Sequence, residues 1–500
     1  MQGALQQKAQ DEWIRQGVAD RVQVLYSSID QPRVDKVQLE KMSHIDSRFV
    51  VTAHQPVILG GPLYVLYKLS SVVALARQLN KHPRRGKLHF IPVYWVGDED
   101  HDLDEVGHCH VLGKKISWNP HTAGATGRML IENPEEFLSP LELVLGNRPE
   151  AARWMQLARD CYRHGVTLLE ATLRWTDALF GAAGLVVFSG DDTRLKGMAM
   201  SLWEAEIHKG FSAQAANEGG GKLLELGYHA QISPRAVNLF WLEQGSRARL
   251  VRQDAGGWQA GGKIWADDMA LLQHLKDEPE KISPNVVLRP VYQEFLLRSA
   301  AFVGGPAEVA YWLQLYPVFL RAGVYFPPVL LRASMMLMDD IMSKRWQQFA
   351  LGDELLCRSK EDWVRAFLEK QSDGGLKDRE ALQTVRNTYL HLAEEAAATD
   401  PSLKSFVLAE LSKAEKSIES VAQRVLKAQK QKNEVNINRL HVLHERLFPE
   451  GQFQERHDNF LSWVASDAKN QLLDYCLNHL DYPTQNLLLL RLSSESGQSG

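Results

Sequence analysis

The feature that most constrains the fold is a pattern near the N-terminus, in which one loop and one helix separate two apolar runs. Arg48–Thr52 (RFVVT) and Leu88–Val96 (LHFIPVYWV) are rich in β-branched and aromatic residues, which indicates buried strands. Between them, AHQPVILGGPLY must be a loop, and YVLYKLSSVVALARQLN has apolar residues at helical spacing. A strand, loop, helix and strand within about fifty residues form a βαβ unit, which implies a parallel sheet.

Later segments extend this α/β core. Gly184–Ser189 (GLVVFS) predicts another buried strand, and Phe326–Arg332 (FPPVLLR) predicts the last strand of the core. The segment VLRPVYQEFLL is a strand or a helix, and it leads through a Gly-Gly-Pro turn into a helix. Residues 107–180 look mostly helical, and the Gly- and Arg-rich region 210–265 looks β-rich. We therefore expect one core over residues 1–375, with insertions at about 107–180 and 210–280.

The composition changes from about Leu376, where a helix rich in Leu, Ala, Glu and Arg runs to Ala398. Asp400-Pro401 breaks this helix, and Asp400 suits the N-cap of the next one. Apolar residues then recur at the 3-4 spacing of a heptad, interrupted only by Lys432: Leu411, Ala414, Ile418, Val421, Val425, Ala428 and Val435. This pattern predicts a coiled-coil arm over 376–447, either an antiparallel hairpin or an oligomerisation arm that makes a homodimer. A helical segment over 448–492 and a disordered tail over 493–500 would follow.

Composition excludes several classes of function. The 500 residues carry a net charge of −4, so there is no basic excess for nucleic acid. The four cysteines are far apart, which argues against disulfides and against a four-cysteine zinc site, and suits a reducing compartment. The N-terminus does not look like a signal peptide, and no run of 18 apolar residues exists to cross a membrane. We expect a cytoplasmic protein.

Polar residues gather in the loop after the first strand. His54-Gln55-Pro56 stands there with Gly61, Tyr64 and Lys68. Ligands of a doubly wound sheet bind at the carboxyl ends of its strands, and free N–H groups at a helix start can hold an anion. His54 could donate to a phosphate and Lys68 could add charge, while the alternative is a turn that its glycines and prolines merely shape. No GxGxxG or P-loop pattern is present.

A run of acids follows the second strand. Gly97–Glu105 (GDEDHDLDE) holds six carboxylates and one histidine. Their repulsion is costly unless cations, ammonium groups or sugar hydroxyls bind there, or unless the run is solvated. Its place at the ligand edge of the sheet favours a binding site. The neighbouring His108, Cys109 and His110 are zinc-ligand types, but their spacing matches no standard zinc template.

Two more stretches have the residue types of a binding site. Arg289 stands near Gln293, and its guanidinium fork suits a carboxylate or a phosphate. Gly304-Gly305 precedes a helix and again favours an anion at the helix start. Tyr311 and Trp312 could stack on a base or a sugar, although aromatic residues at this spacing are more often core.

Together these stretches resemble one family, the cysteine ligases of bacillithiol biosynthesis. The matching blocks are TAHQPVILGGPLYVLYK, IPVYWVGDEDHDLDEV, SPNVVLRPVYQEFLL and VGGPAEVAYWLQL, and HERLFPEGQFQERHDNFL resembles the end of that family. The resemblance spans nearly the whole chain in the family's order. Gly60-Gly61 departs from the family's Thr-Gly, which leaves the turn intact.

The resemblance implies a Rossmann-type core similar to class I aminoacyl-tRNA synthetases and nucleotidyltransferases, with inserted connecting segments and a coiled coil that makes the dimer. It also implies the addition of L-cysteine to glucosamine malate, which gives bacillithiol. Amide formation from a free carboxylate needs activation, which ATP or a related nucleotide would supply through an adenylate. The sequence does not reveal whether a metal takes part.

These considerations give each candidate residue an expected role. We expect catalytic roles for His54, Asp100, His101 and Asp102. We expect substrate binding, with amines held by the acidic run, from Glu99, Asp104, Glu105, Arg289, Gln293, Tyr311 and Trp312. We expect phosphate or other anion binding from Gln55, Gly61, Tyr64, Lys68, Gly304 and Gly305.

Two rival interpretations remain open at this point. The same core could serve a nucleotidyltransferase or another adenylate-forming enzyme acting on a different acid, without dependence on cysteine. Alternatively, the coiled coil could be the function, in a scaffold that binds no nucleotide. A tRNA synthetase is disfavoured, because the net charge is −4 and no basic anticodon-binding region or clear KMSKS motif appears.

Overall fold

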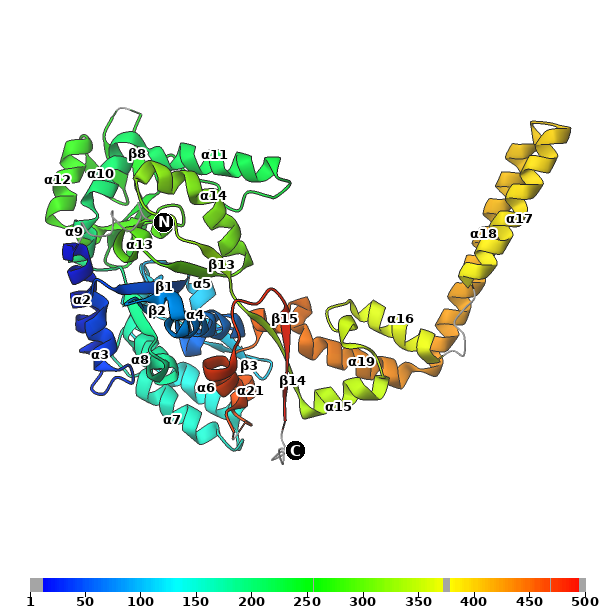
Figure 1. Cartoon of the computed structure of the whole chain (residues 1–500), viewed down its shortest axis with the longest axis horizontal. Helices are drawn as coiled ribbons and strands as arrows, with labels where there is room; N and C mark the ends of the chain where they lie inside the picture. Colours follow the sequence, from blue (N-terminus) through cyan, green and yellow to red (C-terminus); the bar gives the residue numbers. More distant parts are fainter. Residues whose placement is uncertain (1–11, 255, 372–377, 468, 494–500) are drawn as a thin grey trace. The chain divides into compact units, whose positions relative to one another are not determined.

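The computed structural model describes residues 12–254, 256–371, 378–467 and 469–493 (Figure 1). The chain divides into two compact units. The first ends at Met336 and resumes over Glu455–Leu489, and the second covers Leu337–Gln454 and resumes at Leu490. Most of the predicted disordered tail, residues 494–500, lies outside the described residues.

The first unit is built on a five-stranded parallel sheet with the order β13-β12-β1-β2-β5. The strands are β1 (Ser47–His54), β2 (His89–Val96), β5 (Val186–Ser189), β12 (Ala301–Gly304) and β13 (Val329–Leu331). In the register, Val51 lies opposite Val93 on one side and Phe302 on the other. Four of these strands match predicted runs, and the Rossmann-type parallel core is confirmed.

Helix α4 (Leu63–Lys81) makes the predicted crossover and packs against β1 and β2 (Figure 1). It is buried from Val65 to Ala76, which explains its nearly continuous apolar sequence. Helix α14 (Pro306–Ala322) follows β12 and packs on β12 and β13, beginning with a proline at the first helical position. The ambiguous segment before β12 is a helix, α13 (Arg289–Leu297). The other helices of this part are α2 (Glu12–Tyr26), α3 (Lys36–Glu40), α5 (Leu103–Val106), α9 (Thr193–Met198), α10 (Met200–Lys209) and α12 (Asp268–Asp277).

The two insertions differ in part from their predicted structures. The first begins with a hairpin, β3 (His108–Val111) and β4 (Lys114–Ser117), before the helices α6 (Glu135–Leu145), α7 (Ala151–Cys161) and α8 (Leu168–Phe180). The second begins with a helix, α11 (Phe211–Glu225), although its glycines suggested otherwise. Gly219 is needed there because α11 packs closely on α14: an added Cβ would lie 1.8 Å from the Gln314 carbonyl oxygen.

Beyond α11 the second insertion is β-rich, as predicted. Its strands are β6 (Leu239–Glu243), β7 (Ser246–Arg249), β8 (Val251–Arg252), β9 (Trp258–Ala260) and β10 (Lys263–Trp265), and β11 (Ile282–Pro284) follows α12. The order β11-β6-β7 forms one small antiparallel sheet, and β10-β9-β8 forms another.

The second unit contains the predicted helical hairpin. Helices α17 (Asp378–Thr399) and α18 (Leu403–Lys432) run side by side after a short turn (Figure 1), with Arg386 and Glu415 paired at 2.8 Å. The heptad prediction is wrong at its end, because α18 stops at Lys432 and Val435 lies in the next helix. Lys432 is exposed in the last turn, where a cation suits the helix dipole, and it does not interrupt a buried seam. The other helices are α15 (Asp340–Phe349), α16 (Lys360–Gln371) and α19 (Glu434–Leu447).

The C-terminal segment is only partly helical. It contains the short helices α20 (Gln454–His457), α21 (Leu461–Val464) and α22 (Gln471–Asp474), and it ends in a strand, β15 (Leu487–Leu492), which pairs with β14 (Ser334–Asp339). All four cysteines are free. Among the described residues, no helix is both long and apolar enough to span a bilayer.

Candidate functional site

A cleft of about 680 Å³ lies at the carboxyl ends of β1 and β2 and at the start of α14. The sheet order reverses direction between β1 and β12, and ligands of doubly wound sheets bind at such a point. The opposite wall comes from the β6–β7 hairpin and the residues that follow β11. The predicted site residues that line it are His54, Gln55, Tyr64, Lys68, Glu99, Asp100, Glu105, Arg289, Gly305 and Tyr311.

Other predicted site residues do not line this cleft. Trp312 is fully buried and stacks on Phe302, with ring centroids 3.9 Å apart, so it belongs to the core. Asp102 is exposed and caps α5, and Asp104 is exposed in the same helix. His101 is exposed beside the cleft, with Nδ1 3.3 Å from Arg247 Nη1.

Three further predicted residues, Gln293, Gly304 and Gly61, shape the surroundings of the cleft without lining it. Gln293 is buried and accepts a hydrogen bond from Arg289 at 2.9 Å, which orients that guanidinium. Arg289 also donates to the Tyr311 hydroxyl at 3.4 Å. Gly304 ends β12 and accepts the Arg332 backbone N–H at 2.9 Å. Gly61 has a φ of +66°, a conformation that favours glycine, and shapes the loop before α4.

His54 ends β1 and is neutral at physiological pH. Burial, helped by the positive charge of Lys68, lowers the pKa of His54 to about 4. Its Nδ1 lies 3.0 Å from the Gln55 carbonyl oxygen, which can only accept, so Nδ1 carries the proton. Nε2 is therefore the acceptor for the Tyr64 hydroxyl at 2.9 Å.

Lys68 is tied to the start of α14. The side chain is buried, and Nζ lies 2.5 Å from Glu308 Oε2 and donates to the Ala53 carbonyl oxygen at 2.7 Å. Glu308 also accepts the Gly305 N–H at 2.8 Å, which caps the helix. Although burial opposes it, the charge of Lys68 keeps the pKa of Glu308 below its ordinary value. Lys68 therefore joins α4 to α14 beside His54.

Arg332, just after β13, was missed by the sequence reasoning. It is 3% exposed and donates from both Nη atoms to Glu455, at 2.9 and 2.5 Å. Within the described part of the chain, its buried Nε has no hydrogen-bond partner. A Cβ added to Gly305 would lie 3.7 Å from this Nε, so the unsatisfied donor adjoins the N-terminus of α14. An arginine at the end of the predicted last core strand, Phe326–Arg332, was the only signal available.

The acidic run has two buried members, Asp98 and Glu99, which are 2% and 8% exposed. Glu99 Oε1 lies 2.5 Å from Nζ of Lys196, and burial nevertheless raises the pKa of Glu99. Lys196 is fully buried in α9 and also donates to Asp191 at 2.7 Å. Arg128 adds two hydrogen bonds to Asp191, both of 2.6 Å. Despite burial, these cations lower the pKa of Asp191.

Asp100 connects the acidic run to the opposite wall of the cleft. Its carboxylate accepts from Arg247 at 3.1 Å and from Gln55 at 3.2 Å. Gln55 also donates to Glu105, so two carboxylates share one amide. Arg247 lies over the Phe240 ring at 4.2 Å, which fixes the β6–β7 hairpin beside the run. Nothing in the local sequence indicated that the second insertion reaches the site.

The cleft also holds exposed arginines: Arg235, Arg249 and Arg456 all line it. Among the described residues, no ion pair is found for any of these three side chains. The cleft therefore presents these cations as well as the anions of the acidic run. Such a surface fits ligands that carry both signs of charge.

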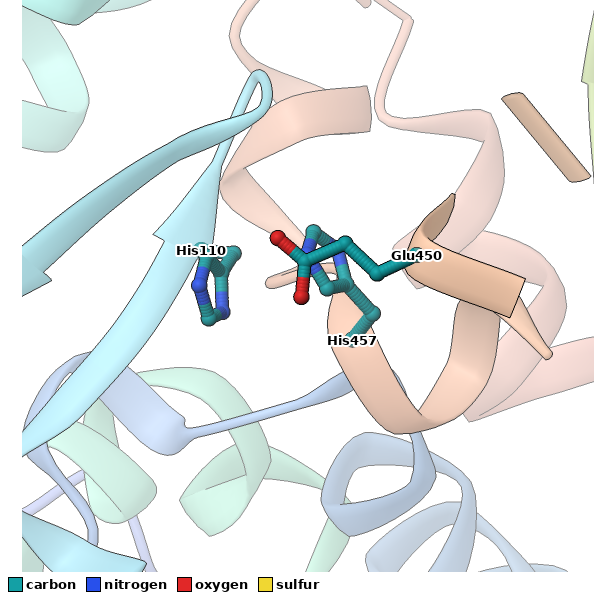
Figure 2. Close-up of side chains that lie close together, drawn as sticks. All are labelled: His110, Glu450 and His457. Carbon is teal, nitrogen blue, oxygen red and sulfur yellow. The ribbon is translucent and has the colours of Figure 1, made fainter. Parts of the chain in front are cut away.

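The C-terminal segment holds the His54 loop in place. Asn459 Nδ2 donates to the carbonyl oxygens of Leu59 and Gly61, at 2.9 and 2.6 Å. Figure 2 shows His457 beside His110, and their rings stack with centroids 4.1 Å apart. Arg456, next to His457 in the same segment, lines the cleft.

The three neighbouring residues of zinc-ligand types, His108, Cys109 and His110, do not form one metal site. In β3, side chains alternate between the two faces of the strand, so Cys109 points away from His108 and His110. Cys109 is buried, and this burial raises the pKa of its thiol to about 12. A thiol on the far face of the strand cannot join the two histidines around one ion.

Comparison with known proteins agrees with this architecture. Residues 2–333 match the family model described as "Bacillithiol biosynthesis BshC, N-terminal Rossmann-like domain", and residues 335–492 match "Bacillithiol biosynthesis BshC, C-terminal coiled-coil domain". A relative from Flavobacterium johnsoniae is 33% identical, covering 91% of this chain and 85% of that protein. One from Christiangramia forsetii is 31% identical, covering 98% and 91%. Both are named "Putative cysteine ligase BshC". The chain belongs to the bacillithiol biosynthesis BshC family.

Proposed function

We propose that this chain is a ligase that joins L-cysteine to glucosamine malate through an amide bond and so forms bacillithiol. Its family membership and the names of its relatives support the reaction class. The observation that carries the proposal is the two-sided cleft, with the acids of the run on one side and the α14 N-terminus with Arg332 on another. A reaction between an amino acid and an amino sugar needs sites for both phosphate and ammonium groups.

The α14 end of the cleft fits the phosphates of a nucleotide. ATP would supply a phosphate leaving group to the cysteine carboxylate, which as a free carboxylate is too stable to form an amide. In the first turn of α14, Ala307 and Glu308 have N–H groups without acceptors in their own helix. The unsatisfied Nε of Arg332 adjoins them, and Arg456 adds a charge at the cleft surface. Neutral His54 and Tyr64 lie beside this end.

The acidic run fits the ammonium groups of the substrates. Asp100 and Glu105 line the cleft and are held in place by Gln55. Charge-assisted hydrogen bonds from an ammonium group to these oxygens would hold the amino sugar near the activated carboxyl group. Arg247 stays paired with Asp100 and limits how far the carboxylate can move.

The direct test is incubation of the full-length protein with L-cysteine, glucosamine malate and ATP, with the product identified by mass. We expect the amide product only when all three are present. Product that forms equally with another amino acid would favour a ligase of different specificity. A complete lack of cysteine-dependent product would contradict the proposal.

His54→Ala is expected to reduce product formation up to about 10-fold, because it removes the acceptor that orients the Tyr64 hydroxyl, a neutral hydrogen bond worth about 0.5–1.5 kcal/mol. The melting temperature should change little, because the imidazole lines the cleft at the end of β1 and is not packed in the core. Tyr64→Phe is the matched comparison, since it removes the partner hydroxyl and keeps the imidazole. Initial rates and thermal unfolding measure the two effects, and a rate equal to that of the wild type would exclude His54 from the site.

We also propose that the helical hairpin makes a homodimer. Large apolar side chains stand exposed on it, with Phe406 62% and Val421 59% exposed. Phe406→Glu with Val421→Glu should convert a dimer to a folded monomer, and deletion of residues 376–445 should leave a monomer or an insoluble core. Light scattering at micromolar concentration measures the mass, with Lys416→Glu as a control on the charged surface. A monomeric wild type would contradict this proposal.

A further inference from the structure

Asp98 is the acid of the run that is most enclosed, and the roles given above do not use it. It follows β2, lines the floor of the cleft and is 2% exposed. Asp100 and Glu105 reach the same cleft from more open positions. A carboxyl group placed at the end of a central strand is held more rigidly than one on a surface turn.

Two neighbouring segments fix the position of Asp98. The Ser189 hydroxyl, at the end of β5, donates to Asp98 Oδ2 at 2.6 Å. The Gly127 N–H donates to the Asp98 backbone oxygen at 2.8 Å. A Cβ at Gly127 would lie 2.3 Å from the Asp98 Cβ, so this close approach requires glycine. The segment Thr126–Arg128 therefore clamps the backbone of Asp98 and, through Arg128, holds Asp191.

The charges around Asp98 leave it without a cation of its own. The groups that face it or its immediate acidic neighbours are Glu99, Asp191, Lys196, Arg128, Arg247, Tyr94, Tyr292 and Ser189. Lys196 is shared between Glu99 and Asp191, and Arg128 is bound to Asp191. Among the described residues, no ion pair reaches Asp98. Burial first, and then the negative charge of Asp191, raises the pKa of Asp98 to about 7.

We propose that the Asp98 carboxylate is the base that takes the proton from the ammonium group of the attacking amine. This step rests on the function proposed above. Asp98 accepts one proton from the ammonium group and becomes a neutral carboxylic acid, which frees the nitrogen lone pair. That lone pair forms the C–N bond to the activated carboxyl carbon, and the nucleotide phosphate leaves with the electron pair of the broken C–O bond. The second nitrogen proton passes to the departing phosphate.

Separate measurement of the two half-reactions tests this role. Cysteine-dependent exchange of pyrophosphate into ATP reports activation, which needs no amine deprotonation, while mass analysis reports amide formation. In Asp98→Asn, exchange should stay within about twofold of wild type, and amide formation should fall by about 100-fold or more at pH 7. The wild-type rate of amide formation should rise with pH up to about 7, and the variant should lose this rise.

Ser189→Ala gives a second test that keeps the carboxylate. The Ser189 hydroxyl stabilises the ionised form of Asp98, so its removal should move the rise in rate to higher pH. Asp192→Asn is the matched control, because it removes a nearby carboxylate outside the cleft, and asparagine also serves as the N-cap of α9. Its pH profile should match that of the wild type.

The outcomes separate the two proposals. A wild-type protein that shows neither exchange nor product overturns the proposed function and this step with it. An active wild type whose Asp98→Asn variant keeps the same pH-dependent rise in amide formation overturns the role of Asp98 alone. Equal losses of exchange and amide formation in Asp98→Asn would also overturn it, since they indicate a general disturbance of the cleft.

Discussion

Lys196→Met is expected to destabilise the first unit by roughly 3–5 kcal/mol, the cost of leaving the buried Glu99 carboxylate without its partner. Lys196 is fully buried and lies 2.5 Å from Glu99 and 2.7 Å from Asp191. Methionine fills a similar volume but cannot neutralise either carboxylate. Thermal and urea unfolding of the wild type and the variant measure the loss. A change below about 1 kcal/mol would show that water or rearrangement replaces the ammonium group.

The loss of stability in Lys196→Met should grow as the pH rises. Without Lys196, the folded-state pKa of Glu99, which burial already raises, moves further above its unfolded value, whereas Asp191 keeps its pair with Arg128. The folded variant therefore binds more protons. Stability is then greatest below the ordinary carboxyl pKa of about 4 and falls as pH rises through the folded value. The gap between wild type and variant should therefore be wider at pH 8 than at pH 5. Adding Glu99→Gln to Lys196→Met removes the unpaired carboxylate and should recover part of the stability, which a purely steric defect would not allow.

The sequence predicted those parts of the fold that local pattern determines. The strands around His54 and Asp98 are continuous apolar runs, and such runs are typical of a parallel sheet buried on both faces. Their order along the chain then requires both loops to emerge at one edge, and the structure brings Gln55 within 3.2 Å of Asp100. Helix α11 was missed because its three glycines argue against a helix, and only close packing on α14 explains Gly219.

The rest of the site could not be predicted because tertiary contacts create it. Arg247 reaches Asp100 from an insertion 147 residues away in the sequence, and Glu455 meets Arg332 across 123 residues. An arginine in a surface strand and one in the cleft look the same in a single sequence. Trp312 is the opposite case. It follows the Gly304-Gly305 turn and was predicted to bind substrate, but it is buried against Phe302. How the insertions pack against the sheet determines which side chains come together in the site. Local sequence periodicity does not predict this packing.

Arg332→Met is expected to have two effects, one on stability and one on nucleotide binding. Glu455 is 4% exposed and accepts hydrogen bonds from both Nη atoms of Arg332. The variant leaves this buried carboxylate unpaired, which should lower the free energy of unfolding by roughly 3–5 kcal/mol. Loss of the Nε donor beside α14 should weaken ATP binding by about 10- to 100-fold, equivalent to about 1.5–3 kcal/mol. Thermal unfolding and calorimetric titration with ATP measure the two effects separately.

A second substitution separates them. Glu455→Gln removes the charge that Arg332 neutralises, so Arg332→Met with Glu455→Gln should regain much of the lost stability and still bind ATP weakly. Glu455→Gln alone keeps the guanidinium and should bind ATP nearly as the wild type does. If the double variant binds ATP as tightly as the wild type, Arg332 serves only to join β13 to α20. If it remains weak while stability returns, the unsatisfied Nε is a ligand-binding donor, because a structural role would have been restored together with the fold.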